Sequence, residues 1–311
     1  MSRSLALCAG AVLSALLLAP PAARADGTMI FNGIGMLDYA SGRKECKVGT
    51  WTRYHMVGKS ELGVVSDYTV TVLIAGEEHW WGEDCFWVET QTTMADQPPQ
   101  TNATLMSYAI FDDSLAIPHL QLYMRKTIPG LNADGTPMQE LYKRAVSSLK
   151  SREPVGANIR WNVDTLANDT TLTTVLGPLK CRQVRIDQGT GVTAQAADSS
   201  LYTEVRETRL DYLSPKVPLT HIAREDVDYG AWRRTWLIGR SSESGPMRVM
   251  DRSRGVATLE GCGSSGVEAK LVPLHLRRSL AEQRAAGAKV RTGAAATAKT
   301  PAAAKPAPAK R

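Results

Sequence analysis

The densest group of side chains that could do chemistry runs from Glu77 to Asp84, a stretch of two Glu, His, two Trp, Gly, Glu and Asp. Glu77, His79 and Asp84 are ligand types that a divalent cation accepts. Consecutive residues of a hairpin point in different directions, however, so these three are not expected to converge. We interpret the stretch as a solvated turn between strands, and we predict no metal and no cofactor.

The sequence patterns of common catalytic sites are absent. There is no H-E-x-x-H, no G-x-S-x-G, no glycine-rich dinucleotide motif and no phosphate-binding loop, and the five histidines are isolated. We therefore predict no catalytic residue and no enzyme. One alternative stays open, a secreted hydrolase that assembles its site from distant residues, with Glu77, Glu78 or Asp84 among them. The pairs Trp80-Trp81 and Trp232 with Trp236 are candidates for stacking on sugars or lying at a membrane surface.

The N-terminal segment resembles an export signal in all three of its parts. Arg3 precedes an apolar run from Leu5 to Ala19, and Ala23-Arg24-Ala25 provides small residues around a cleavage site. The run is shorter than the roughly 20 residues that span a bilayer. We predict residues 1–25 to be a signal peptide that is cleaved after Ala25, which places the protein in the periplasm.

Four cysteines follow the predicted cleavage site, and an even number in an exported chain indicates two disulfides. Their spacing is unlike that of a zinc site. Cys46 precedes the first expected strand and Cys85 begins the third, which brings both to one end of a meander. Of three possible connectivities we predict Cys46–Cys85 and Cys181–Cys262.

The elements between residues 26 and 286 read mainly as β-strands of a single domain. Asp67–Ile74 alternates clearly, with Tyr68, Val70, Val72 and Ile74 on one face. Further strands are expected at 50–56, 85–93, 105–111, 119–126, 170–176, 180–187, 201–210, 219–225, 233–238, 247–250 and 256–259. These short runs with turn-like links are typical of antiparallel sheets.

One helix is expected at 136–149. Thr136 and Gln139 form a capping box around Pro137. Leu141 and Ala145 belong to an apolar stripe at helical spacing. We expect this helix to cover the apolar face of the sheet. A shorter helix is expected at 276–286.

Several segments resemble secreted bacterial proteins related to the outer-membrane lipoprotein-sorting carriers (the LolA/LolB-like superfamily). These are Val48–Tyr54, Ile74–Glu78, Phe86–Glu89 and Ser214–Leu219. The resemblance implies a half-open antiparallel β-barrel whose concave apolar face is covered by helices and shelters acyl chains. Four cysteines and a basic tail depart from the common pattern, so only the architecture and the ligand class carry over.

The charge is distributed unevenly. The two ends hold nine of the 37 basic residues and none of the 31 acidic ones, so residues 26–282 carry 28 basic residues and a net charge of −3. No basic excess on the body indicates nucleic-acid binding. Residues 287–311, rich in Ala, Lys and Pro, are expected to be a disordered tail. The tail is either a solubilising end or a contact for anionic lipid, an envelope protein or a polymer.

The sequence therefore predicts a non-enzymatic periplasmic protein that binds a lipid or other amphiphile and serves lipid or lipoprotein handling. Association with the outer membrane is one option for its location. The candidate cavity is lined by Val70, Val72, Ile74, Leu141 and Ala145. The alternative is a structural or interaction protein of the cell envelope, with a core filled by its own side chains.

Overall fold

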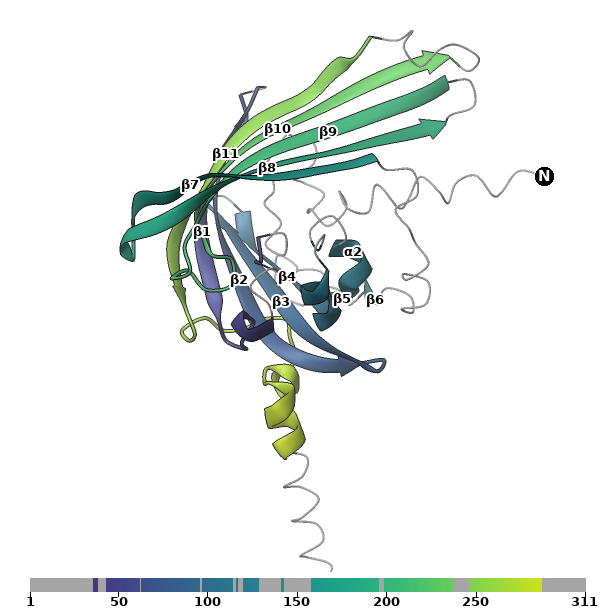
Figure 1. The fold of residues 1–311 in the computed structure, drawn as a ribbon. Coiled ribbons are helices and arrows are strands. Elements are labelled where there is room, and N and C mark those ends of the chain that lie inside the picture. Colours follow the sequence, from purple (N-terminus) through teal and green to yellow (C-terminus); the bar gives the residue numbers. More distant parts are fainter. Residues whose placement is uncertain are drawn as a thin grey trace, which may run out of the picture.

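The computed structural model describes residues 36–38, 43–61, 63–95, 97–113, 116, 120–128, 141–142, 158–195, 199–237 and 246–286. The predicted signal peptide and the predicted tail lie outside these residues. The described residues form one 11-stranded antiparallel sheet (Figure 1). Its strands are β1 (Trp51–Ser60), β2 (Val65–Trp80), β3 (Glu83–Met94), β4 (Gln97–Ser107), β5 (Met124–Ile128), β6 (Leu141–Tyr142), β7 (Asn158–Thr174), β8 (Gly177–Gln195), β9 (Ser199–Leu213), β10 (Ile222–Leu237) and β11 (Arg248–Gly263).

The sheet consists of two meanders joined side by side. Strands β1 to β6 follow one another in space, strands β7 to β11 do the same, and β1 pairs with β11. Strands β6 and β7 are the two edges, so the sheet is not closed into a barrel. The prediction of a mainly β, half-open antiparallel sheet is confirmed. The long strands β8 to β11 project away from β1 to β4 in Figure 1, and we call them the arm.

The inner face of the sheet, which carries Val70 and Val72, forms the larger core. Strand β2 alternates as predicted, with Tyr68, Val70, Val72 and Ile74 all in this core. Two short helices pack on the same face: the 3-10 helix η4 (Tyr108–Asp112) and α2 (Leu120–Tyr123). The inner face is thus covered, as expected, although by elements that precede the predicted helix.

The outer face of β2 to β5 forms a second core with the segment that follows β11. Leu73, Trp87 and Leu105 pack there with Val272. The carboxylate of Glu89, which has no exposed surface, accepts hydrogen bonds from the backbone N–H groups of residues 270, 271 and 272 at 2.7, 2.9 and 3.4 Å. A buried charge with several donors is well compensated, so Glu89 holds the C-terminal segment on the sheet.

The C-terminal segment continues into a helix at residues 280–286, close to the expected position. Ser279 and Glu282 form a capping box: the Glu282 carboxylate accepts from Ser279 N at 2.9 Å, and Ser279 Oγ accepts from Glu282 N at 3.2 Å. No helix in the described parts of the chain is both long and apolar enough to cross a membrane.

The prediction of a helix at 136–149 is wrong where it can be compared with the structure. Leu141–Tyr142 is strand β6, paired with residues 126 and 127 of β5. Pairing with a sheet edge gives the backbone hydrogen-bond partners that override a local helical pattern. The rest of the predicted helix, including Ala145, lies outside the described residues.

The predicted disulfides are also wrong. None of Cys46, Cys85, Cys181 and Cys262, all within the described residues, forms one. Cys46 belongs to the inner core and Cys85 to the outer core, so the sheet lies between them. Cys181 on β8 and Cys262 on β11 are separated by strands β9 and β10. Three strand spacings of about 4.8 Å exceed the reach of a disulfide.

Candidate binding site on the inner face

The arm carries a row of charged side chains on its inner face, where an apolar core would be expected. Glu207, Arg209 and Asp211 occupy alternate positions of β9, and Glu225 lies directly opposite Asp211 on β10. Alternate residues of a strand share a face, so all four point the same way. We call these four residues the inner charge cluster.

The register of the sheet fixes which face the cluster occupies. Glu225 pairs with Ala257 of β11, and Ala257 pairs with Met56 of β1. Both Ala257 and Met56 belong to the inner core. The cluster therefore continues the apolar inner surface sideways into the arm. Apolar side chains adjoin it on both sides, because Ala257 of β11 pairs with Glu225 and Val184 of β8 pairs with Asp211.

The cluster is buried, yet its charges are poorly matched. Glu225, Asp211 and Arg209 are 1%, 3% and 7% exposed. One guanidinium faces three carboxylates. Its contacts, Nη1 to Glu225 Oε1 at 3.6 Å and Nε to Glu207 Oε1 at 3.7 Å, are longer than a hydrogen bond. Buried ion pairs of such geometry do not offset the cost of removing the charges from water.

Several polar atoms of this region have no hydrogen-bond partner among the described residues. They are Arg209 Nε, Asp211 Oδ1, Glu225 Oε2 and, on β11, Ser253 Oγ. Ser253 pairs with Tyr229, which in turn pairs with Glu207, so its hydroxyl lies on the same face. Buried polar groups without partners cost about 1–3 kcal/mol each. Their grouping marks a place that a polar ligand group would complete.

A buried carboxylate without enough hydrogen-bond donors is also stabilised by taking up a proton. Burial raises the pKa of Glu225 to about 8, against the lowering effect of Arg209. Burial also raises the pKa of Asp211 and of Glu207, and in each case Arg209 again opposes the shift. Burial thus favours the neutral form of the carboxyl groups in the cluster.

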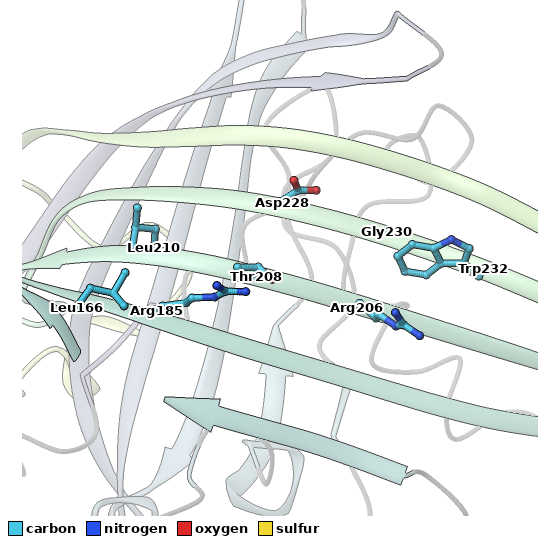
Figure 2. Close-up of a pocket in the computed structure, with 8 residues that line it drawn as sticks. All are labelled: Leu166, Arg185, Arg206, Thr208, Leu210, Asp228, Gly230 and Trp232. Atoms are coloured by element: carbon cyan, nitrogen blue, oxygen red, sulfur yellow. The ribbon is translucent and has the colours of Figure 1, made fainter. Parts of the chain in front are cut away.

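A hollow of about 540 Å³ lies on the outer face of the arm (Figure 2). It is lined by Leu166, Arg185, Arg206, Thr208, Leu210, Asp228, Gly230 and Trp232. Its charges are matched by neighbours: Arg206 contacts Glu204 at 2.7 Å and Asp228 contacts Arg254 at 3.1 Å. The hollow is a weaker candidate than the inner charge cluster, since its charged groups already have partners.

The cavity residues predicted from the sequence occupy different places. Val70, Val72 and Ile74 lie together on the inner face, at most 1% exposed, and pack among other core side chains. Leu141 lies on β6 at the edge of the sheet, and Ala145 falls outside the described residues. The hollows lined by arm residues do not include them.

The polar stretch at 77–84 forms the hairpin between β2 and β3, and of its three candidate ligands only His79 and Asp84 meet, while Glu77 points elsewhere. Glu77 accepts hydrogen bonds from Tyr108 Oη at 2.5 Å and from Leu280 N at 2.6 Å. Glu78 contacts Lys126 at 3.2 Å. Asp84 contacts His79 at 2.9 Å. The described residues contain no group of three or more metal-ligating side chains.

Sequence reasoning missed the inner charge cluster. Its signal is the alternation Glu207-x-Arg209-x-Asp211, which defines one face of a strand. Alternating charges normally face water, so the pattern alone assigns them to the wrong side. Only the register against β10 and β11 shows that this face continues the core.

Comparison with known proteins gives a distant likeness only. No protein-family model and no curated protein matches the sequence. One similar solved structure is that of a Bacteroides fragilis protein with a YmcC-like fold: the two sequences are 10% identical, the match covers 70% of this chain and 96% of that chain, and the TM-score is 0.28. Another is Rv2717c from M. tuberculosis: 10% identity, 70% of this chain, 94% of that chain, TM-score 0.20. At these scores neither likeness identifies a family or a function.

Proposed function

We propose that the protein is exported to the periplasm and acts there without catalysis, binding an amphiphile on the inner face of its sheet. The polar head of the ligand would lie on the inner charge cluster and its apolar part along the neighbouring side chains. The observation that carries the proposal is the set of buried polar atoms without partners on Arg209, Asp211 and Glu225.

The composition of the cluster suggests the chemistry of the head group. The cluster contains three acidic groups and only one guanidinium. A ligand that donates hydrogen bonds or carries positive charge is therefore favoured over an anion. A zwitterionic head with an ammonium and a phosphate group fits both signs. The ammonium would meet Asp211 and Glu225, and the phosphate would meet Arg209, a geometry that guanidinium groups favour.

The surroundings of the cluster support an amphiphile over a fully polar ligand. Val184, Ile186 and Val227 are buried on the same face, at the register positions next to Asp211 and Arg209. They are themselves only 3%, 8% and 7% exposed, so the apolar part of a ligand would displace their present neighbours before gaining about 25 cal/mol for each Å² of apolar surface removed from water.

One observation favours the alternative of an envelope structural protein. Val72 and Ile74 have no exposed surface, so the apolar inner face of β2 is already filled. An acyl chain would therefore lie beside the arm rather than against β2. Absence of ligand binding by the folded protein would make the structural role the better account.

Lipid binding is tested by displacement of a fluorescent fatty-acyl probe. Phosphatidylethanolamine should displace the probe better than phosphatidylglycerol of the same chain length, because only the first has an ammonium. In the variant Asp211→Asn/Glu225→Gln the preference for phosphatidylethanolamine over phosphatidylglycerol should fall about ten-fold or more, because a charge-assisted hydrogen bond to the ammonium is lost. The matched control is Asp226→Asn/Asp228→Asn, which removes two carboxylates from the opposite face of β10.

Native mass spectrometry of protein purified from its own envelope provides an independent readout. A retained lipid with an ammonium-bearing head would support the proposal. Failure of the folded wild-type protein to bind the probe at several chain lengths would refute it. Equal behaviour of the cluster variant and its control would refute the assignment of the head group to the cluster.

A further inference from the structure

The free end of the arm has an unusual composition. The described residues around the β10–β11 connection are 232–237 and 246–250, with sequences WRRTWL and PMRVM. We call them the arm tip. They include three arginines, two tryptophans and no acidic residue. The tip lies at the end of the arm that projects furthest from β1 to β4 (Figure 1).

Two of these arginines face each other across the strands. Arg233 of β10 pairs directly with Arg248 of β11, and both side chains are exposed. Together with Thr235, Pro246 and Met250 they line a hollow of about 350 Å³. Like charges directly opposite on neighbouring strands destabilise the pair. Within the part of the chain that the structure describes, neither guanidinium is ion-paired with a carboxylate.

Large apolar side chains are exposed beside these arginines. Leu237, Val249 and Met250 are 54%, 49% and 46% exposed. Val249, which pairs with Trp232, and the half-buried Trp236 lie on the outer face. Leu237 is four residues from Arg233 and therefore shares the inner face with it. Exposed apolar side chains grouped with cations that lack acidic neighbours are typical of surfaces that contact lipid.

We propose that the arm tip docks on an anionic lipid surface. The guanidinium groups of Arg233 and Arg248 would contact lipid phosphates, while Leu237 and Met250 enter the interface. Charge complementarity selects this partner: Arg233 and Arg248 are exposed, lie opposite each other, and form no ion pair with a carboxylate among the described residues. The proposal concerns a different part of the fold from the inner charge cluster and does not depend on the amphiphile bound there.

The test is flotation of the full chain with vesicles of phosphatidylcholine, with and without phosphatidylglycerol. Wild-type protein should float with the anionic vesicles, and added salt should weaken this binding. Arg233→Ser/Arg248→Ser should lower the partition coefficient about twenty-five-fold, about five-fold for each arginine. Leu237→Ser/Met250→Ser should weaken binding even at high salt, where the electrostatic contribution is screened.

A matched control removes two charges from the opposite end of the arm. Arg182 and Lys216 are exposed there, near the start of β10, because Arg182 pairs with Leu213 and Leu213 pairs with Ile222. Arg182→Ser/Lys216→Ser should bind like wild type after allowance for net charge. Circular dichroism and the urea midpoint show that each variant is folded.

Three results would overturn the proposal. One is equal binding to neutral and anionic vesicles, and another is an Arg233→Ser/Arg248→Ser variant that binds like its control. The third is vesicle binding that survives both tip variants, which would assign the contact to another basic segment such as residues 287–311. Probe displacement is measured without vesicles, so these outcomes leave the test of the inner charge cluster unaffected.

Discussion

Replacing Glu225 with glutamine is expected to stabilise the protein near pH 8 and to flatten its stability between about pH 5 and pH 8. Burial raises the pKa of Glu225 from its ordinary 4.5 to about 8. Between those values the carboxyl is protonated in the folded state and ionised in the unfolded state, so unfolding releases a proton. Stability therefore falls as pH rises, by up to about 1.4 kcal/mol per pH unit, and the whole effect is at most about 5 kcal/mol.

Other ionisable groups act in a known direction in this pH range. Burial also raises the pKa of Asp211 and Glu207, which adds to the fall in stability with rising pH. Hydrogen bonds from His79 and Thr208 lower the pKa of Asp84 and Asp187 below 3.8, so their stabilising effect is lost only at more acid pH. These two residues do not obscure the comparison.

The assay is urea unfolding at several pH values for wild type, Glu225→Gln and the outer-face control Asp228→Asn. The free energy of unfolding of wild type should decrease with pH more steeply than that of Glu225→Gln. The control should follow wild type, because Asp228 is exposed and contacts Arg254 on the other face. Parallel profiles for wild type and Glu225→Gln would show that Glu225 is not held protonated by burial, and the reasoning would fail.

Two further predictions concern the outer core and the cysteines. Glu89→Ala removes the acceptor of three backbone N–H groups and should lower the free energy of unfolding by about 3 kcal/mol. Backbone hydrogen exchange at residues 268–276 should be faster in this variant than in wild type. Unchanged exchange there would contradict the anchoring role of Glu89. Burial raises the pKa of the Cys85 thiol to about 12 and also raises those of Cys181 and Cys262. Maleimide should therefore label these thiols slowly in the folded protein and completely in urea without reductant, and fewer labelled thiols in urea would indicate disulfides after all.

The class of fold could be predicted because local pattern and final environment agree on the inner face of β2. Val70 and Val72 alternate with polar residues, and the structure buries that face. The lengths of the strands could not be predicted. Residues 222–225 and 233–237, from the separate runs expected at 219–225 and 233–238, belong to the single strand β10, since both of its neighbours are long enough to pair along it.

Elements that depend on distant partners were predicted less well. The apolar spacing around Leu141 indicates a helix, and only the edge of β5 explains a strand there. Cys46 and Cys85 were predicted to lie at the same end of the first meander, but a disulfide also requires that they share a face. Whether the residues before β1 pack inside or outside the sheet depends on tertiary packing, which the sequence pattern does not contain.

The two buried glutamates, Glu89 and Glu225, give the strongest argument that the inner charge cluster is a site. They are 0% and 1% exposed, so both bear the cost of removing a carboxyl group from water. The oxygens of Glu89 accept hydrogen bonds from three consecutive backbone N–H groups, as expected of a structural anchor. Glu225 has one distant guanidinium at 3.6 Å and one oxygen without a partner among the described residues. The same fold thus satisfies one buried carboxylate fully and leaves the other poorly satisfied at a net cost in stability. Natural proteins retain such costs mainly where function requires them. Glu225→Gln should therefore raise the stability of the protein and weaken ligand binding at the inner charge cluster.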